Sequence, residues 1–221
     1  MRLADATSAE TADARLVLVP VGSLEQHGPH LPLDTDTVIA TATAQAAGQR
    51  LGAWVAPAVA YGSSGEHQSF GGTVSIGTSV LHQTLLELTR SLRTWVDQVV
   101  FVNGHGGNVA ALNAAVDQLV VEGHRVAWVP CASETVDLHA GRTETSLMLH
   151  LRPASVRQDR IAAGDTRSLP EILPLLLARG VAAVSANGVL GDPAGASAEE
   201  GVSVLAAMVE DLVARVAVAA R

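Results

Sequence analysis

The chain of 221 residues is long enough to form one domain, spanning 1–221, with a hydrophobic core of its own. Hydrophobic residues make up 48% of the sequence and charged residues only 16%, which excludes a disordered chain. The formal net charge of -8, with no cluster of basic residues, argues against nucleic acid as a partner.

The cysteine content and the length of the apolar runs indicate the cellular compartment of the protein. The single cysteine, Cys131, cannot form a disulfide within the chain, and the N-terminal residues lack the apolar core of a signal peptide. No apolar run approaches the roughly 20 residues that cross a bilayer. We therefore expect a cytoplasmic protein with no membrane partner. Because nothing supplies a base for Cys131, we interpret it as a buried structural thiol and not as a nucleophile.

Short apolar, Val-rich runs alternate with longer stretches of helical period, a pattern typical of βαβ units. The predicted strands, in chain order, are Arg15–Val21, Trp54–Val59, Thr73–Ile76 with a weaker signal, Val99–Val102 and Arg125–Val129. The predicted helices are Thr37–Leu51, Ser79–Val96, Val109–Glu122 and Ala198–Ala219. The stretches Ala162–Pro174 and Gly188–Ala198 are interpreted as surface connections. The predicted fold class is α/β, a single domain with a mostly parallel β-sheet flanked by helices.

Histidines and carboxylates follow three of the predicted strands. The segment Gly22–Asp36 follows the first of them, Asn103–Asn108 follows Val99–Val102, and Asp137–Ser146 comes after the last. Ligands of an open parallel sheet bind at the carboxyl ends of its strands. We therefore expect the functional residues to meet at that edge of the sheet.

The side chains in these segments are of the types that bind transition metals. Carboxylate oxygens and imidazole nitrogens suit Zn, Fe or Mn, and one carboxylate can bridge two ions. Glycines beside His105 let the backbone approach an ion closely, and prolines near His27 restrict their loop. A two-metal site is therefore chemically reasonable.

Other interpretations remain open for individual residues. The glycines around His105 could cradle a phosphate, but the P-loop Lys-Ser/Thr and the dinucleotide-binding spacing are missing. Glu25 and Asp34 could be turn or cap residues, and His30 could be either a ligand or a buried, hydrogen-bonded histidine. Their joint occurrence at strand ends favours a site. A further segment carries candidate substrate-contacting or supporting residues, with an ordinary polar loop as the alternative: Ser64, Glu66 and His67.

The run GSLEQHGPHLPLDTD, from Gly22 to Asp36, resembles a motif of the creatinine amidohydrolase family. The resemblance continues through Glu66-His67, Asn103–Asn108 and His139–Ser146, and so covers most of the chain. It implies a creatininase-like fold and a dinuclear-metal-dependent amide or peptide hydrolase with Zn and/or Fe, or Mn. The resemblance also implies a homo-oligomer, but it does not give the number of subunits.

The resemblance also implies roles for individual residues. Glu25 and His27 would bind separate metals, Asp36 would bridge them, and His105 would be a fourth ligand. Creatininase has a Glu two residues after that His, where this chain has Gly107. The ligand set that the resemblance implies is completed by a carboxylate from the Glu-Thr-Ser sequence, Glu144.

Motifs outside the metal segments are similar to the mycofactocin-system branch of this family. They are Tyr61–Gln68, Phe101–Val109, Thr143–Ser146, Gly180–Ser185 and Gly188–Pro193. This likeness implies a peptidase that hydrolyses a modified precursor peptide and releases a C-terminal fragment derived from Val and Tyr.

We expect metal-assisted amide hydrolysis, in which the leaving amine is protonated by His139, or by Glu144 if that residue is not a ligand. One alternative keeps the enzyme class but has a small cyclic amide or a formamide as substrate. The other alternative is a non-catalytic protein that binds a metal or a small molecule.

Overall fold

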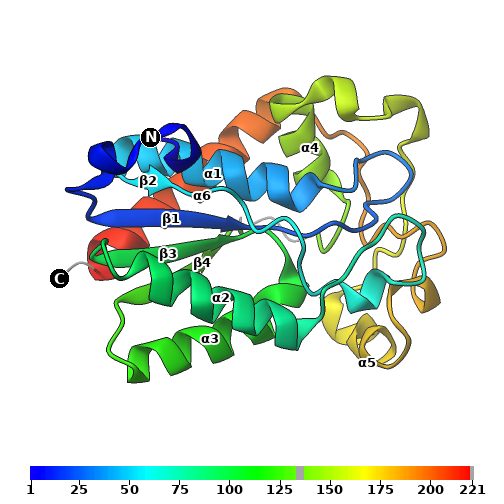
Figure 1. Cartoon of the computed structure of the whole chain (residues 1–221). Helices are drawn as coiled ribbons and strands as arrows, with labels where there is room; N and C mark the ends of the chain where they lie inside the picture. The colour runs from blue at the N-terminus through cyan, green and yellow to red at the C-terminus, as the bar shows by residue number, and fades with distance from the viewer. Residues whose placement is uncertain (133–136, 220–221) are drawn as a thin grey trace.

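The computed structural model describes residues 1–132 and 137–219. A four-stranded parallel sheet in the order β2-β1-β3-β4 lies at its centre (Figure 1). The strands are β1 (Leu16–Val21), β2 (Trp54–Val55), β3 (Gln98–Asn103) and β4 (Val126–Pro130). The side chains of β1 and β3 are buried almost throughout, as expected of central parallel strands covered on both faces.

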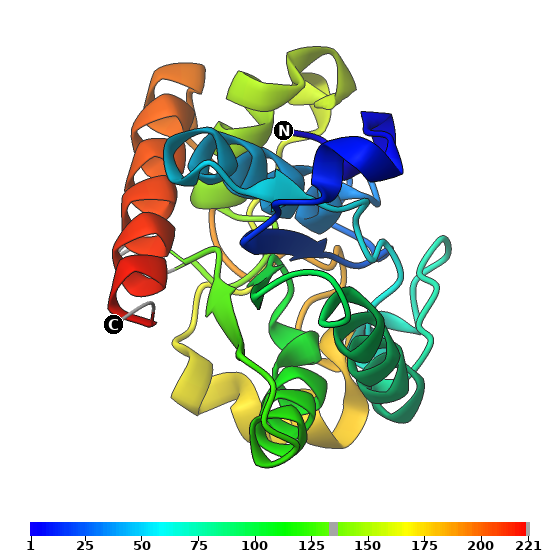
Figure 2. The ribbon, with the colours of Figure 1, turned by 60° about the vertical axis from the view of Figure 1, so that its left-hand side comes forward.

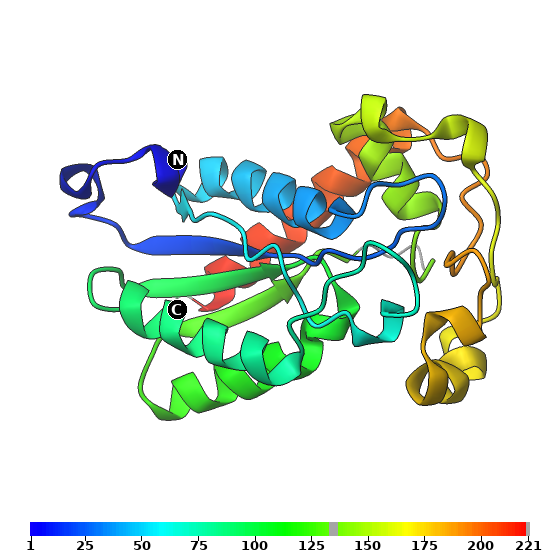
Figure 3. The same ribbon diagram turned by 45° about the vertical axis from the view of Figure 1, so that its right-hand side comes forward.

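Helices cover both faces of the sheet (Figures 1 and 2). The α-helices of the described residues are α1 (Thr35–Leu51), α2 (Thr78–Leu92), α3 (Val109–Val121), α4 (Arg142–Leu151), α5 (Leu169–Arg179) and α6 (Ala198–Ala219). Helices α2 and α3 pack on one face of the sheet and α1 and α6 on the other, whereas α5 lies beyond the carboxyl ends of the strands (Figure 3). Val17 and Val19 of β1 pack with α2 and α3, whereas Leu18 between them packs with α1 and α6. This alternation follows from the two-residue period of a strand and gives the sheet a core on each side. Within the described ranges, no helix is long and apolar enough to span a membrane.

The fold class is confirmed. Of the predicted strands, Trp54–Val59 is shorter than expected and Thr73–Ile76 is not a strand. Regular pairing of β2 ends at Val55, before Pro57, which lacks the backbone N–H that a ladder requires. Val59 retains a single bridge to Val21. The stretch Thr73–Ile76 is not a strand, and only Val74 pairs, in one antiparallel bridge to the loop after β1.

The helices differ from the prediction mainly in the second half of the chain. Helix α2 ends at Leu92, short of the predicted Val96, and α4 lies in a segment for which no helix was predicted. Helix α5 occupies part of Ala162–Pro174, which was interpreted as a surface connection. Its prolines favoured a loop, yet one stands in the first turn, and a capping box of Ser168 with Glu171 starts the helix.

The carboxyl ends of β1 and β3 come close together at one edge of the sheet (Figure 3). A Cβ placed on Gly104, just after β3, would lie 2.5 Å from the backbone oxygen of Asp36. Only glycine therefore lets the end of β3 approach the start of α1 this closely. The loops after the strands and the first turn of α1 converge at this edge.

Candidate metal centre

Three residues from the first loop and α1 form the base of the candidate site. Glu25 and His27 lie in the loop after β1, and Asp36 lies in the first turn of α1. All three are at most 1% exposed. The hydroxyl of Ser23 donates a hydrogen bond of 2.6 Å to Asp36 Oδ2, which fixes the orientation of that carboxylate.

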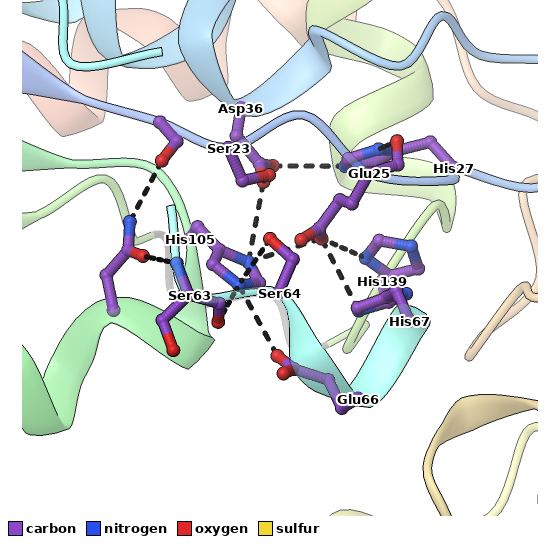
Figure 4. A network of polar contacts seen from close by, with 12 residues as sticks. Ser23, Glu25, His27, Asp36, Ser63, Ser64, Glu66, His67, His105 and His139 are labelled. Atoms are coloured by element: carbon purple, nitrogen blue, oxygen red, sulfur yellow. Dashed lines mark hydrogen bonds and ion pairs between the residues drawn. The ribbon is translucent and has the colours of Figure 1, made fainter. Parts of the chain in front are cut away.

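The first candidate ligand group joins Glu25, Asp36 and His105. His105 Nδ1 lies 3.2 Å from Glu25 Oε1 and 3.4 Å from Asp36 Oδ2 (Figure 4). Neither carboxylate oxygen of Glu25 accepts a hydrogen bond in the described part of the chain. A fully buried carboxylate without such partners needs a compensating positive charge.

The second group joins His27, Asp36 and Glu144. His27 Nε2 lies 3.0 Å from Asp36 Oδ1 and 3.9 Å from Glu144 Oε2. Asp36 thus turns one oxygen towards each group, which is the arrangement of a bridging carboxylate. The backbone N–H of Ala140 donates to Glu144 Oε2 at 2.6 Å and holds that side chain in place.

The outer hydrogen bonds of the histidines fit metal ligation. His27 Nδ1 lies 3.1 Å from the carbonyl oxygen of Glu25, and His105 Nε2 lies 3.2 Å from that of Ser63. A carbonyl only accepts, so in these contacts the ring nitrogen donates and the other nitrogen faces the carboxylates. Metal-binding histidines are oriented in this way by their second nitrogen. The donor set therefore fits two divalent ions.

The electrostatics of the second group lead to the same conclusion. Burial lowers the pKa of His27, but the carboxylates of Asp36 and Glu144 outweigh burial and raise that pKa to about 10. Burial raises the pKa of Glu144 to about 7; the charge of His27 opposes this rise and that of Asp36 adds to it. The carboxylates of Asp36 and Glu144 thus stabilise a positive charge between them. In the absence of a metal, a proton on His27 supplies this charge, and a bound ion would displace that proton.

His67 and His139 lie on the other side of Glu25. Their nearest ring nitrogens are 3.4 Å and 3.7 Å from Glu25 Oε1, and their rings are 4.4 Å apart between centroids. Burial lowers the pKa of His67 to about 4 and that of His139 well below its usual range. His139 also forms a candidate ligand group with Glu25 and His27. Both imidazoles are neutral near pH 7 and can accept a proton or bind a metal.

The sequence did not indicate the role of Gln26, which lies between two predicted ligands. Its side-chain nitrogen lies 2.8 Å from His67 Nδ1 and 3.0 Å from His139 Nε2, and its backbone oxygen lies 2.7 Å from the latter nitrogen. Gln26 therefore orients both imidazoles: its side-chain amide donates to His67 Nδ1, and its backbone oxygen accepts from His139 Nε2. Asn108 joins two of the loops around the site. Its side-chain N–H donates to the backbone oxygen of Gly22, and its side-chain oxygen accepts from the backbone N–H of Ser63.

A cavity of about 950 Å³ opens beside the cluster and is lined by Glu66 and His67. Of the three residues predicted to contact substrate, Ser64 is fully buried and is not part of this lining. Its hydroxyl instead lies 3.5 Å from His105 Nε2. His30 lies in none of the ligand groups found among the described residues, and its Nε2 contacts Thr145 Oγ1 at 2.9 Å.

The carboxylate of Glu66 occupies the space beside Gly107. Glu66 Oε1 lies 3.3 Å from His105 Nε2, on the side of His105 away from Asp36 (Figure 4). A Cβ at position 107 would lie 2.4 Å from each of these two atoms and 2.4 Å from the backbone oxygen of Ser63. A side chain at 107 and the present position of Glu66 are therefore mutually exclusive.

The substitution Gly107→Ala is expected to reduce metal binding. The backbone oxygen of Ser63 cannot move cheaply, so the new methyl group pushes His105 away from Glu25 and Asp36. Elemental analysis should then give a lower metal-to-protein ratio than in the unaltered chain. Gly106→Ala is the matched control, because a Cβ there meets nothing within 4 Å. Equal ratios in the two variants would contradict the placement of His105 as a ligand.

Comparison with known proteins gives one family and close relatives. The family model for creatininase, described as creatinine amidohydrolase, matches residues 1–216. A mycofactocin precursor peptide peptidase from Mycobacterium ulcerans (strain Agy99) is 54% identical over 210 residues, which cover 91% of this chain and 84% of the relative. A protein of the same description from Mycobacterium tuberculosis (strain CDC 1551 / Oshkosh) is 53% identical over 226 residues, covering 97% and 90%.

Solved structures of creatininase share the fold. A creatininase variant of the Zn-Zn type is 26% identical, with a TM-score of 0.81 over 97% of this chain and 96% of that one. A creatininase described with Mn is 27% identical, with a TM-score of 0.80 over 97% and 96%.

Proposed function

This chain belongs to the creatinine amidohydrolase family, and on that basis we propose that it is a metal-dependent peptidase of mycofactocin biosynthesis. It hydrolyses the modified precursor peptide and releases a C-terminal fragment derived from Val and Tyr. The observation that carries the proposal is the identity of 53% to a mycofactocin precursor peptide peptidase over 97% of the chain. The buried carboxylate and histidine groups supply the donor atoms that such a hydrolase needs.

The proposed cofactor is a pair of divalent ions, Zn and/or Fe, or Mn. Glu25 and His105 would hold one ion, His27 and Glu144 would hold the other, and Asp36 would be shared, in keeping with two of the ligand groups. Creatininases of the Zn-Zn type and with Mn support Zn and Mn among these metals. When bound, such ions supply Lewis acidity: they polarise a carbonyl group and lower the pKa of water towards about 7.

The chain's own residues provide the proton transfers of the proposed reaction. Hydrolysis adds one water across the C–N bond, so the acyl side leaves as a carboxylate and the amine takes up a proton. His139 lines the cavity, and its Nε2 contacts the backbone oxygen of Gln26, so that Nδ1, which lies 3.7 Å from Glu25 Oε1, is the nitrogen that can move a proton. Neutral His139 takes the proton that water loses and passes it to the amine. Glu144 has this role if it is not a ligand.

We further propose a homo-oligomer in the cytoplasm. An apolar surface at the end of α3 supports an oligomer, since Val120 and Val121 are 55% and 89% exposed. Light scattering on the purified protein tests this part of the proposal.

The substrate is tested with the metal-loaded protein and two candidate substrates in parallel. Mass spectrometry is expected to detect the Val-Tyr-derived fragment from the modified peptide and little or no turnover of creatinine. Rapid creatinine hydrolysis with an intact peptide would instead support a hydrolase of a small cyclic amide. Full metal occupancy without hydrolysis of either compound would support a non-catalytic metal-binding protein.

A further inference from the structure

Helix α5 presents two different apolar faces. Ile172 is 1% exposed and packs with Val181 and Leu190 in a small core away from the sheet. On another face, Leu169, Leu173 and Leu177 recur every four residues and are 40%, 37% and 79% exposed. We call these three residues the leucine face. All of them line the cavity that also contains the metal-centre residues.

The end of α5 is fixed against the metal centre. Gly180 has φ +73, and a Cβ on it would lie 2.6 Å from the backbone oxygen of Glu66. The backbone after α5 therefore packs directly on the turn that carries Glu66, whose carboxylate contacts His105. Figure 3 shows α5 beyond the carboxyl ends of the strands, apart from the helices that cover the sheet. The leucine face is thus held in place as one wall of the cavity.

Arg179 lies at the end of this wall. The chain contains no lysine, and among the described residues Arg179 is the single arginine that lines the cavity. It makes no hydrogen bond or ion pair with any residue of the described ranges. A guanidinium group can lie flat on an aromatic ring. The wall therefore suits a ligand that is both apolar and aromatic.

We infer that the leucine face and Arg179 bind the Val-Tyr-derived end of the substrate and so determine specificity. The inference rests on the proposed function. The leucine face is about 12 Å long, because eight helical steps of about 1.5 Å separate its first and last residues, and two extended residues span about 7 Å. The leucines contact the aliphatic part of the fragment, and the guanidinium of Arg179 stacks on its phenol ring.

The helix provides a matched pair of variants for the test. Leu173 and Leu175 are both 37% exposed, but only Leu173 lines the cavity. With metal-loaded protein and the modified peptide, Leu173→Ser is expected to raise KM about tenfold, since part of a leucine contact is lost. Leu175→Ser should leave KM unchanged, and both variants should keep the wild-type kcat and metal content. Arg179→Gln should raise KM severalfold.

Inhibition by the released fragment tests which part of the peptide binds to the leucine face. The fragment is added to the peptide assay as a competitive inhibitor. Its inhibition constant should rise by the same factor as KM in Leu173→Ser. A raised KM with an unchanged inhibition constant would mean that another part of the peptide occupies this face and would overturn the inference. Equal effects of Leu173→Ser and Leu175→Ser on KM would also overturn the inference. A loss of the oligomer in Leu173→Ser would overturn it too, because the leucine face would then bind a second copy of the chain. If the wild-type protein does not cleave the peptide, the proposed function itself fails and this inference fails with it.

Discussion

Asp36→Ala is expected to remove both metal ions from the purified protein and to abolish hydrolysis. Its two carboxylate oxygens face different ligand groups, one at 3.0 Å from His27 Nε2 and the other at 3.4 Å from His105 Nδ1. Loss of a shared ligand weakens both sites at once. Glu25→Ala and His27→Ala each remove a ligand from one site and should lower the metal-to-protein ratio by less. Elemental analysis of the variants, purified in parallel, measures these ratios.

Asp34→Ala is the control for the loss of an acidic side chain at the start of α1. Asp34 pairs with Arg152 and belongs to none of the three groups of candidate ligands found among the described residues. This variant should keep its metals and its activity. If Asp36→Ala instead retained full occupancy while the control behaved normally, Asp36 would not be the bridging ligand.

Glu144→Gln is expected to lower peptide hydrolysis by more than about 100-fold, because it removes a proposed metal ligand and the loss of a residue that only orients a ligand already costs about 10- to 100-fold. The substitution removes the negative charge next to His27 and Asp36, so metal occupancy should also fall, from two ions towards one. Elemental analysis and a mass-spectrometric peptide assay on the same preparation measure the two effects together.

Glu200→Gln serves as the control. Glu200 contacts Arg142 and Ser146, which lie on α4 as Glu144 does, but it belongs to none of the candidate ligand groups. The control should leave both readouts close to wild type. Full metal occupancy together with lost activity in Glu144→Gln would refute ligation by Glu144 and leave it as the proton donor.

The positions of the metal-centre residues could be predicted because they depend on rules that a sequence displays. Parallel strands bring the loops after their carboxyl ends to one edge, so Glu25 and His105 could be placed together from the strand pattern alone. The ligation roles came from the family resemblance. Glu144 was identified in that way too, although its helix was not predicted: Gly141 stands at the N-cap, without the usual Ser, Thr, Asp or Asn signal.

What the sequence could not indicate depends on contacts between distant segments. Gln26 looks like any loop glutamine until the structure places His67 and His139 against its amide. Glu66 and Gly107 are far apart in the chain, and their shared space becomes evident only in three dimensions. Leu169 and Leu173 of α5 lay within the predicted surface connection Ala162–Pro174, because the sequence does not show which cavity these leucines face.

The candidate ligands come from three separate segments: the region from the β1 loop to the first turn of α1, the loop after β3, and α4. In the free protein, protons on His27 and His105 offset part of the negative charge of the buried carboxylates, which raise the pKa of both histidines. With ions bound, the same side chains would cross-link these segments, in the way a disulfide joins distant parts of a chain. An unfolded chain cannot bring them together, so metal binding favours the folded state by mass action. Metal supply in the cell would then govern how much folded protein accumulates, as well as how much of it is active.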